Sequence, residues 1–437
     1  MIGPQRLLPS ITIIVAALAG GAFALLRIST TAATVTTAPV NLDYRQRDAL
    51  VAFYEKRVRI DPADQITLRM LAQQYMQRFR ERYDFSDVTR AADSARRSLR
   101  LQPQGNTSAH MTLASAFLAY HYFGAALAHE RAAVSGEPFN VNARAQVASI
   151  LMETGSYAQA HAELAAIADD PQENPTVDSV RSRYEELTGR LDEARSLMAR
   201  AAETMDSAVG SPAFDRSWFH MRAAQLAFEA GDAGAARAEF TNALALYPDN
   251  AMALLYQARM FRAEKRWSDA LAAASSSVDL YPLPQGLGYV ADAQRALDDE
   301  TGARRTDALI AAEERIFDAQ GVNDRLLANY YAQRGVHLGV ALRAARDDYR
   351  RRGNEIYADD TMAWTLARAG RWHEAQTFAE RSTRLGTQDS EVLFHAGMIA
   401  LHNGAHKQAR AWLTAALDRN PSFDPFDAGT ARAALAF

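Results

Sequence analysis

Small and apolar residues recur along most of the chain at a fixed interval, with polar positions between them. Gly155 and Gly189 are 34 residues apart, as are Ala160 and Ala194. The same interval separates four further pairs, Pro248 and Pro282, Ala236 and Ala270, Gly370 and Gly404, and Ala375 and Ala409. Self-similarity at this period predicts a stack of two-helix units, and therefore an all-α chain.

Each recurrent position has a physical role in such a unit. Two small residues stand where the antiparallel helices cross closely, because a large side chain there would force the helices apart. Glycine stands in the turn between the helices, where it tolerates a positive φ. Proline follows the second helix, which it cannot continue, and begins the link to the next unit.

The block from Ser390 to Phe423 carries all of these marks. Ala396 stands at the first crossing position, Gly404 in the turn, Ala409 at the second crossing position and Pro421 at the end. This pattern resembles the tetratricopeptide repeat, and the resemblance covers about 390 of the residues. It implies a right-handed superhelical solenoid of about ten antiparallel helix–turn–helix repeats. The last two blocks look like the terminal repeats of bacterial membrane-anchored tetratricopeptide proteins, a group with no assigned chemistry.

The repeats divide the chain into predicted segments. Residues 43–206 comprise a lead-in helix and repeats one to four, and residues 207–216 form an irregular connection. Residues 217–423 hold repeats five to ten. Residues 424–437 are expected to form a capping helix that covers the last apolar face.

Two repeats depart from the pattern. In the first repeat, Ala72 and Ala91 are 19 residues apart instead of 12, so either the helices are longer or a loop intervenes near residues 80–87. The seventh repeat has Asp298 where glycine is expected. Because each repeat contacts only its neighbours, we expect the seventh repeat and residues 207–215 to be the least stable parts of the array.

An uncharged apolar run from Leu7 to Leu26 precedes the repeats. Twenty helical residues extend roughly 30 Å, the thickness of the hydrocarbon core, so residues 1–27 are predicted to hold an N-terminal transmembrane helix. The alternative is a signal peptide cleaved after Ala24. Residues 28–42 lack charge, are rich in threonine, alanine and valine, and are predicted to be a linker.

The N-terminal segment also suggests a location for the repeats. Arginine flanks the apolar run on both sides, so the positive residues do not decide the orientation. A short leader before a large domain usually exports that domain. We therefore predict a single-pass membrane protein with an extracytoplasmic repeat domain, periplasmic or on the cell surface, or an exported soluble form after cleavage.

Composition and motifs give no sign of intrinsic chemistry. The net charge of −4 provides no strong field for nucleic acid, and the absence of cysteine excludes disulfides, thiolate metal sites and a cysteine nucleophile. His402 and His406 have a metal-ligand spacing, but Gly404 between them places them on different helices. We expect no catalytic residues, cofactor, metal, nucleic-acid partner or small-molecule substrate.

The resemblance also implies which positions face the concave groove. The implied partner-binding residues are Met111, Leu118, Met152, Trp218, Met221, Phe228, Met252, Leu255, Arg259, Arg262, Trp364, Phe394 and Met398. The apolar members would supply adaptable contacts and anchors, and Arg259 and Arg262 could pair with a partner carboxylate. Alternatively, these side chains pack within a tightly wound superhelix, and the two arginines pair internally.

The predicted function is a non-catalytic protein–protein interaction scaffold, tethered to the cell envelope, that binds a protein or peptide partner in the groove. The alternative is an accessory or regulatory subunit of an enzyme or of an export or assembly complex, with the chemistry in a partner chain. The fold supports a binding role only by analogy, and the sequence does not identify the partner.

Overall fold

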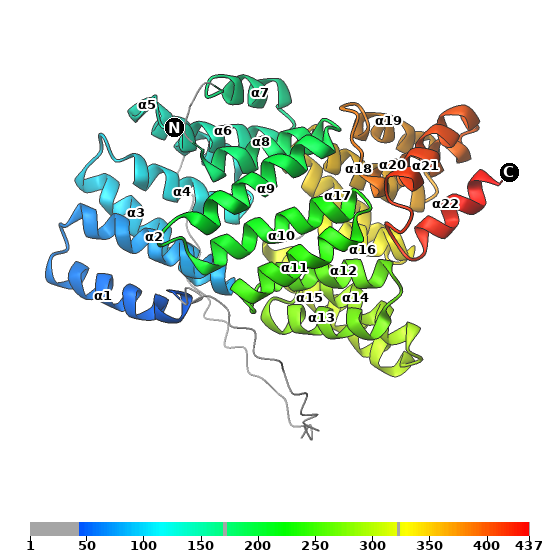
Figure 1. Ribbon diagram of the computed structural model, residues 1–437, viewed down its shortest axis with the longest axis horizontal. Coiled ribbons are helices and arrows are strands. Elements are labelled where there is room, and N and C mark those ends of the chain that lie inside the picture. The colour runs from blue at the N-terminus through cyan, green and yellow to red at the C-terminus, as the bar shows by residue number, and fades with distance from the viewer. Residues whose placement is uncertain (1–42, 169–172, 321–323, 437) are drawn as a thin grey trace. The chain divides into compact units, whose positions relative to one another are not determined.

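The computed structural model describes residues 43–168, 173–320 and 324–436. In these residues it has twenty-two α-helices, one short 3-10 helix and no strand (Figure 1). The 3-10 helix η1 (Asp43–Gln46) and α1 (Arg47–Ile60) lead into ten helical hairpins, and α22 (Asp427–Leu435) follows the last one. The all-helical repeat architecture predicted from the sequence is confirmed.

We call the first helix of each hairpin the inner helix and the second the outer helix. The inner helices are α2 (Gln65–Arg82), α4 (Thr107–Ala119), α6 (Val141–Glu153), α8 (Pro175–Leu187), α10 (Ala213–Glu229), α12 (Ala251–Ala263), α14 (Pro284–Ala296), α16 (Asp324–Arg334), α18 (Ile356–Arg368) and α20 (Ser390–His402). The outer helices are α3 (Phe85–Leu101), α5 (Phe123–Gly136), α7 (Tyr157–Ala165), α9 (Leu191–Ser207), α11 (Ala233–Leu246), α13 (Trp267–Leu280), α15 (Glu300–Gln320), α17 (Leu338–Arg352), α19 (Trp372–Ser382) and α21 (His406–Arg419). The two helices of each hairpin pack together, and from α10 onward each inner helix also packs against the next inner helix.

The residues at the two crossing positions are buried along the array. At the first crossing position, the alanines are at most 1% exposed: Ala72, Ala114, Ala148, Ala224, Ala258, Ala291, Ala328, Ala363 and Ala396. The same holds at the second: Ala91, Ala126, Ala160, Ala194, Ala236, Ala270, Ala303, Ala341, Ala375 and Ala409. In the fourth repeat, Ser182 replaces the first alanine and donates its hydroxyl to the carbonyl oxygen of Ala194 at 2.7 Å. The substitution therefore keeps both the close approach and the hydrogen-bond balance.

The turn within a hairpin keeps one backbone conformation even where glycine is absent. Gly155 and Gly404 have φ values of 70° and 81°. His121, Lys265 and Asp298 occupy the equivalent turns with φ values of 57°, 58° and 63°. A non-glycine residue pays about 1–2 kcal/mol for this conformation. The seventh repeat, which is weak in sequence, thus has the same turn as its neighbours.

The helix bounds give the structure of two segments that the sequence left irregular, the first repeat and the connection before α10. The long spacing in the first repeat arises from long helices, because α2 has 18 residues and α3 has 17. Only residues 83–84 separate these helices, so no loop intervenes. Helix α10 begins at Ala213, within the stretch expected to be irregular, and leaves residues 208–212 as the connection from α9.

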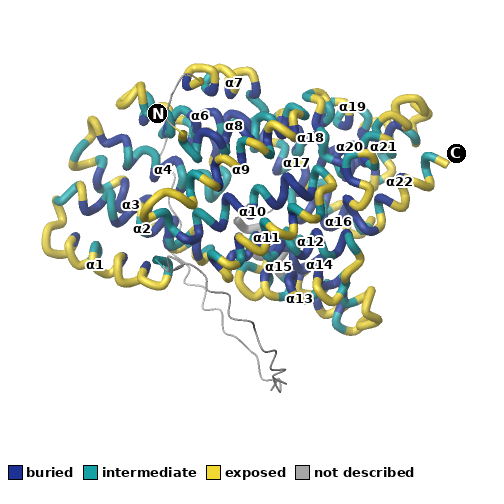
Figure 2. Tube along the Cα trace, in the orientation of Figure 1, coloured by how far each residue is buried: buried dark blue, intermediate teal, exposed yellow. Residues whose placement is uncertain are grey.

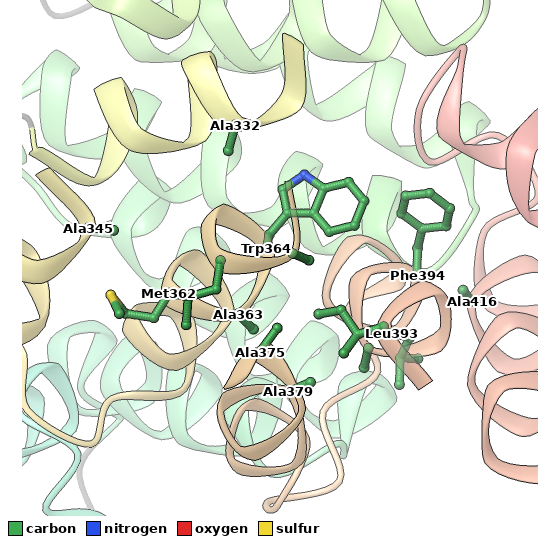
Figure 3. Packing of buried hydrophobic residues seen from close by; sticks show 14 of the residues in the cluster. Ala332, Ala345, Met362, Ala363, Trp364, Ala375, Ala379, Leu393, Phe394 and Ala416 are labelled. Atoms are coloured by element: carbon green, nitrogen blue, oxygen red, sulfur yellow. The ribbon is translucent and has the colours of Figure 1, made fainter. Parts of the chain in front are cut away.

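Hydrophobic side chains form a series of cores between neighbouring helices. Figure 2 shows the buried residues where helices face each other and the exposed residues on the outer turns and connections. In one cluster, Trp364 of α18 lies beside Phe394 of α20, with ring centroids 5.8 Å apart (Figure 3). The small side chains of Ala363 and Ala375 belong to the same cluster, which lets the helix pair α18 and α19 approach closely.

Hairpins that are far apart in sequence touch each other, and we call these contacts the interturn contacts. The backbone N–H of Ile356 donates to the hydroxyl of Tyr157 at 2.9 Å across 199 residues, or about six repeats. The rings of Tyr83 and Tyr281 stack with centroids 4.5 Å apart. The array therefore winds back on itself, so that successive superhelical turns meet.

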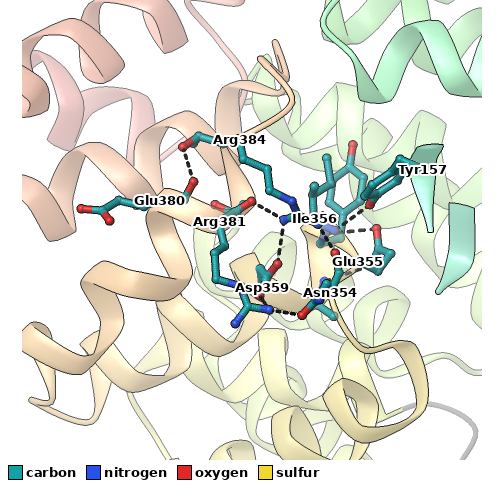
Figure 4. A network of polar contacts seen from close by, with 12 residues as sticks. Tyr157, Asn354, Glu355, Ile356, Asp359, Glu380, Arg381 and Arg384 are labelled. Carbon is teal, nitrogen blue, oxygen red and sulfur yellow. Dashed lines mark hydrogen bonds and ion pairs between the residues drawn. The ribbon is translucent and has the colours of Figure 1, made fainter. Parts of the chain in front are cut away.

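A polar network supports the interturn contact at Tyr157 (Figure 4). Asp359 is fully buried and pairs with Arg381 at 3.0 Å and Arg384 at 2.9 Å. Arg384 also donates to the carbonyl oxygen of Asn354, in the connection before α18. Burial outweighs the two arginines and raises the pKa of Asp359 to about 6. The network fixes the backbone that receives Tyr157.

The predicted anchor at residues 7–26, its alternative cleavage site after Ala24 and the predicted linker at residues 28–42 lie outside the described residues. Among the helices that are described, none is both long and apolar enough to cross a membrane. The envelope tether therefore stays a prediction.

Candidate functional site

A cavity of about 590 Å³ lies between the inner helices, and we call it the lumen. Residues from every inner helix from α6 to α20 line it. Its arginines are Arg183, Arg222, Arg259, Arg262, Arg325 and Arg334. Its carboxylates are Glu186, Glu229, Asp360, Asp389, Glu391 and Asp424, and its tyrosines are Tyr256, Tyr289, Tyr330 and Tyr357. The wall is thus a charged and aromatic surface.

The structure brings three of the predicted groove residues to the lumen, namely Trp218, Arg259 and Arg262. Six others are at most 7% exposed and belong to hydrophobic clusters: Met152, Met221, Phe228, Leu255, Trp364 and Phe394. The remaining four are partly buried and do not line the lumen: Met111, Leu118, Met252 and Met398. Tight winding explains this placement, because apolar positions on the inner helices fill the seams between adjacent helices.

Arg262 links three segments of the wall. Its Nε donates to Asp292 of α14 at 2.8 Å, and its Nη1 donates to Asp424, ahead of α22, at 2.5 Å. Arg334 of α16 reaches the same Asp292 at 2.6 Å. Burial acts against the charge of Arg262, but Asp424 and Asp292 hold its pKa above the ordinary value. Arg262 is therefore an internal cross-link, as the alternative interpretation of the sequence proposed.

Other lumen arginines are also paired across helices. Glu186 of α8 accepts from Arg183 at 2.5 Å and from Arg222 of α10 at 2.8 Å. Burial alone would raise the pKa of Glu186, but the two arginines hold it below its ordinary value. Arg259 of α12 pairs with Glu391 of α20 at 3.1 Å. These pairs compensate most of the charge that faces the lumen.

Glu229 differs from the other lumen carboxylates. It ends α10, and its carboxylate forms neither a hydrogen bond nor an ion pair with any residue in the described part of the chain. Burial, followed by the charges of Glu186 and Asp389, raises the pKa of Glu229 to about 8. The helix C-terminus also disfavours a negative charge. A cation in the lumen would therefore be attracted to this carboxylate and would lower its pKa.

His395 and Asp360 form a further charged pair at the wall. The Nδ1 atom of His395 lies 3.1 Å from both carboxylate oxygens of Asp360, and the imidazole stacks on Trp364 with centroids 4.2 Å apart. Burial opposes the charge on His395, but Asp360 raises its pKa to about 9. The charged histidine thus ties α20 to α18 at neutral pH.

Sequence reasoning missed most of the charged lining, although one signal was available. Glu229 directly follows Phe228, a residue that the resemblance implied for the groove. Charged residues on helices are usually solvated, so the sequence position of Glu229 gave only a weak sign of its place in the lumen.

A comparison with protein-family models supports the repeat assignment. Residues 148–208, 221–283 and 361–425 match a family model described as tetratricopeptide repeat. The crystal structure of the yeast Tom70 is similar at 13% identity and a TM-score of 0.35, covering 90% of this chain and 93% of that one. The structure of the APC/C hetero-tetramer Cut9–Hcn1 is similar at 12% identity and a TM-score of 0.33, covering 90% of this chain and 94% of that one. No curated protein sequence matches the chain significantly.

Proposed function

We propose that this chain, which contains tetratricopeptide repeats, is a non-catalytic scaffold that binds a segment of a partner protein in its lumen. We further propose that residues 7–26 tether it to the cell envelope, with the repeats outside the cytoplasm. The observation that supports the binding role is a cavity lined by eight inner helices, with the unpaired carboxylate of Glu229 in its wall.

The lumen favours a polar segment that carries a lysine or an arginine. An apolar segment would remove water from the charged wall without supplying hydrogen bonds, which is costly. A cationic side chain would instead compensate Glu229 without breaking the existing pairs. Trp218 and Tyr256 also line the lumen, and aromatic faces stabilise an adjacent ammonium or guanidinium group.

The proposal has a defined pH dependence. Glu229 has a pKa of about 8 in the free protein, and a bound cation would lower this pKa. Binding therefore releases a proton whenever the free carboxyl is protonated. The affinity should rise with pH until about 8 and then level off, as long as the cation of the partner stays charged.

Site-specific photocrosslinking in the producing cell tests the location of the site. A photoreactive phenylalanine analogue at Tyr256 probes the lumen, and the same analogue at Tyr122, which is 56% exposed on the outside, serves as the control. We expect crosslinks to one partner segment from position 256 only. Crosslinks confined to position 122 would contradict lumen binding, whereas a single partner at one-to-one ratio would indicate a subunit of a fixed complex.

The affinity of the crosslinked segment, made as a synthetic peptide, tests the role of the carboxylate. Glu229→Gln should weaken binding about tenfold or more and remove its dependence on pH between about 6 and 8. Glu203→Gln changes an exposed carboxylate on α9 and is the matched control, for which we expect no change. Equal affinities for both variants and the wild type would show that Glu229 does not contact the partner.

A further inference from the structure

The two ends of the helical array differ in the surfaces that they expose. At the C-terminal end, α22 exposes small or polar residues: Gly429, Thr430, Arg432 and Ala433. At the N-terminal end, α1 exposes Leu50 at 37%, Phe53 at 52% and Ile60 at 75%. The terminal units of a solenoid ordinarily present a polar outer face, which keeps the protein soluble. Helix α22 follows this rule apart from its N-cap Phe426, which is 54% exposed and stacks on Trp267, whereas α1 does not follow it.

The exposed apolar residues of α1 form one stripe. Leu50, Phe53 and Ile60 recur at helical spacing, and Arg57 shares their face with its guanidinium 5.9 Å from the centre of the Phe53 ring. Ile66 at the start of α2 is also 54% exposed. Helix α1 packs on α2 and η1, and Figure 2 shows most of its length as exposed. The stripe thus lies open at the edge of the array.

Basic side chains border this stripe. Lys56, Arg57 and Arg59 are exposed. Lys56 forms no ion pair within the described part of the chain, whereas Arg57 lies 3.6 Å from Asp64 and Arg59 lies 4.0 Å from Glu55. The carboxylate of Asp48, on the same helix, forms an ion pair with Arg78 at 2.9 Å, which compensates its negative charge. An amphipathic helix with aromatic and aliphatic residues between lysine and arginine matches the interface of a lipid bilayer, where the basic groups reach the head groups.

We propose that the outer face of α1, with Leu50, Phe53 and Ile60 at its centre, lies on the surface of the membrane that holds the N-terminal segment. This inference rests on the tether proposed above. Only sixteen residues separate Leu26 from Asp43, so the described array begins within roughly 55 Å of the end of the apolar run. The tether supplies a high local concentration of lipid, so a modest apolar stripe suffices for binding.

The absence of cysteine makes a clean test possible. Full-length protein carrying Phe53→Cys or Ile60→Cys is labelled with an environment-sensitive fluorophore and reconstituted in phosphatidylcholine vesicles with about 30% phosphatidylglycerol. Phe139→Cys, at 97% exposure in the connection between α5 and α6, is the matched control. Nitroxide-labelled lipids then report which label reaches the bilayer.

We expect blue-shifted emission and at least about twofold stronger quenching by nitroxide lipid at positions 53 and 60 than at position 139. Flotation of the same samples measures the tether separately. Vesicles that carry the protein but leave both labels unquenched would overturn the α1 proposal and keep the tether. Protein that does not float would overturn both. A blue shift that grows with protein concentration and needs no lipid would show that a second copy of the chain covers the stripe.

Discussion

The hairpin turns of repeats three to five and of repeats nine and ten carry the same motif glycine in different surroundings. A Cβ atom on Gly155 would lie 2.4 Å from the backbone carbonyl of Asn354, and one on Gly189 would lie 2.1 Å from the carbonyl oxygen of Gly386. Gly370 and Gly404 have similar φ values of 79° and 81°, but nothing lies within 4 Å of a Cβ on either.

This difference separates two roles of one position. At every one of these turns, glycine relieves the strain of a left-handed backbone. At Gly155 and Gly189 it also lets the next superhelical turn approach to backbone contact. The 34-residue period indicates only that glycine is needed for the left-handed turn. The need for a close approach arises from the winding of the array.

The largest expected effect on stability comes from substituting these glycines with alanine. Gly155→Ala should destabilise the protein by more than about 3 kcal/mol, because a backbone carbonyl blocks the added methyl group. Gly370→Ala strains only the backbone conformation, which costs about 1–2 kcal/mol. Urea unfolding curves of the two variants measure the difference. Equal losses would mean that the interturn contact contributes nothing to stability.

The charge pair between His395 and Asp360 should make the local stability of the last repeats depend on pH. The pKa of His395 is about 9 in the folded protein, above the ordinary value, so the charge pair with Asp360 stabilises fully below about pH 6.5 and is lost as the pH rises through 9. The free energy of local opening of α18 and α20, measured by hydrogen exchange, should fall by on the order of 3 kcal/mol over this pH range.

The control for the pH effect lies on the same helix. His395→Gln should remove this pH dependence, while His402→Gln, at an exposed position that stacks on Trp372, should retain it. An unchanged pH profile in His395→Gln would mean that another group causes the loss.

A smaller effect is expected from the interturn hydrogen bond. Tyr157→Phe leaves the buried N–H of Ile356 without its acceptor and should cost about 1–2 kcal/mol. Tyr184→Phe, on a tyrosine that forms no hydrogen bond through its hydroxyl in the described part of the chain, is the control. Thermal unfolding of both variants provides the measurement. A loss at Tyr184 equal to that at Tyr157 would assign the effect to the ring rather than to the contact between turns.

The repeat fold followed from the sequence because its signals are local. The alanine at each crossing and the residue at each turn act within one hairpin, so a 34-residue period reports them directly. Even Asp298, which breaks the glycine pattern, adopts the expected turn, because the surrounding helices fix its backbone. Trp218, Arg259 and Arg262, which the resemblance implied for the groove, lie on the lumen wall.

Which side chains line the lumen and pair there depends on contacts between residues far apart in the sequence, and no local sequence pattern predicts these contacts. Arg262 meets Asp424 across 162 residues, and Glu229 lacks an equivalent partner in the described chain only because of where α10 ends relative to its neighbours. Met152, Phe228 and Trp364 were placed in hydrophobic seams by the closeness of adjacent inner helices.

The sequence by itself therefore determined the helices, their pairing and the register of the repeats, since these depend on side chains within one or two turns of each other. Only the tertiary structure decided which polar side chains face a common cavity and which turns touch. Small rotations between repeats add up along the array, and their sum brings together residues about six repeats apart.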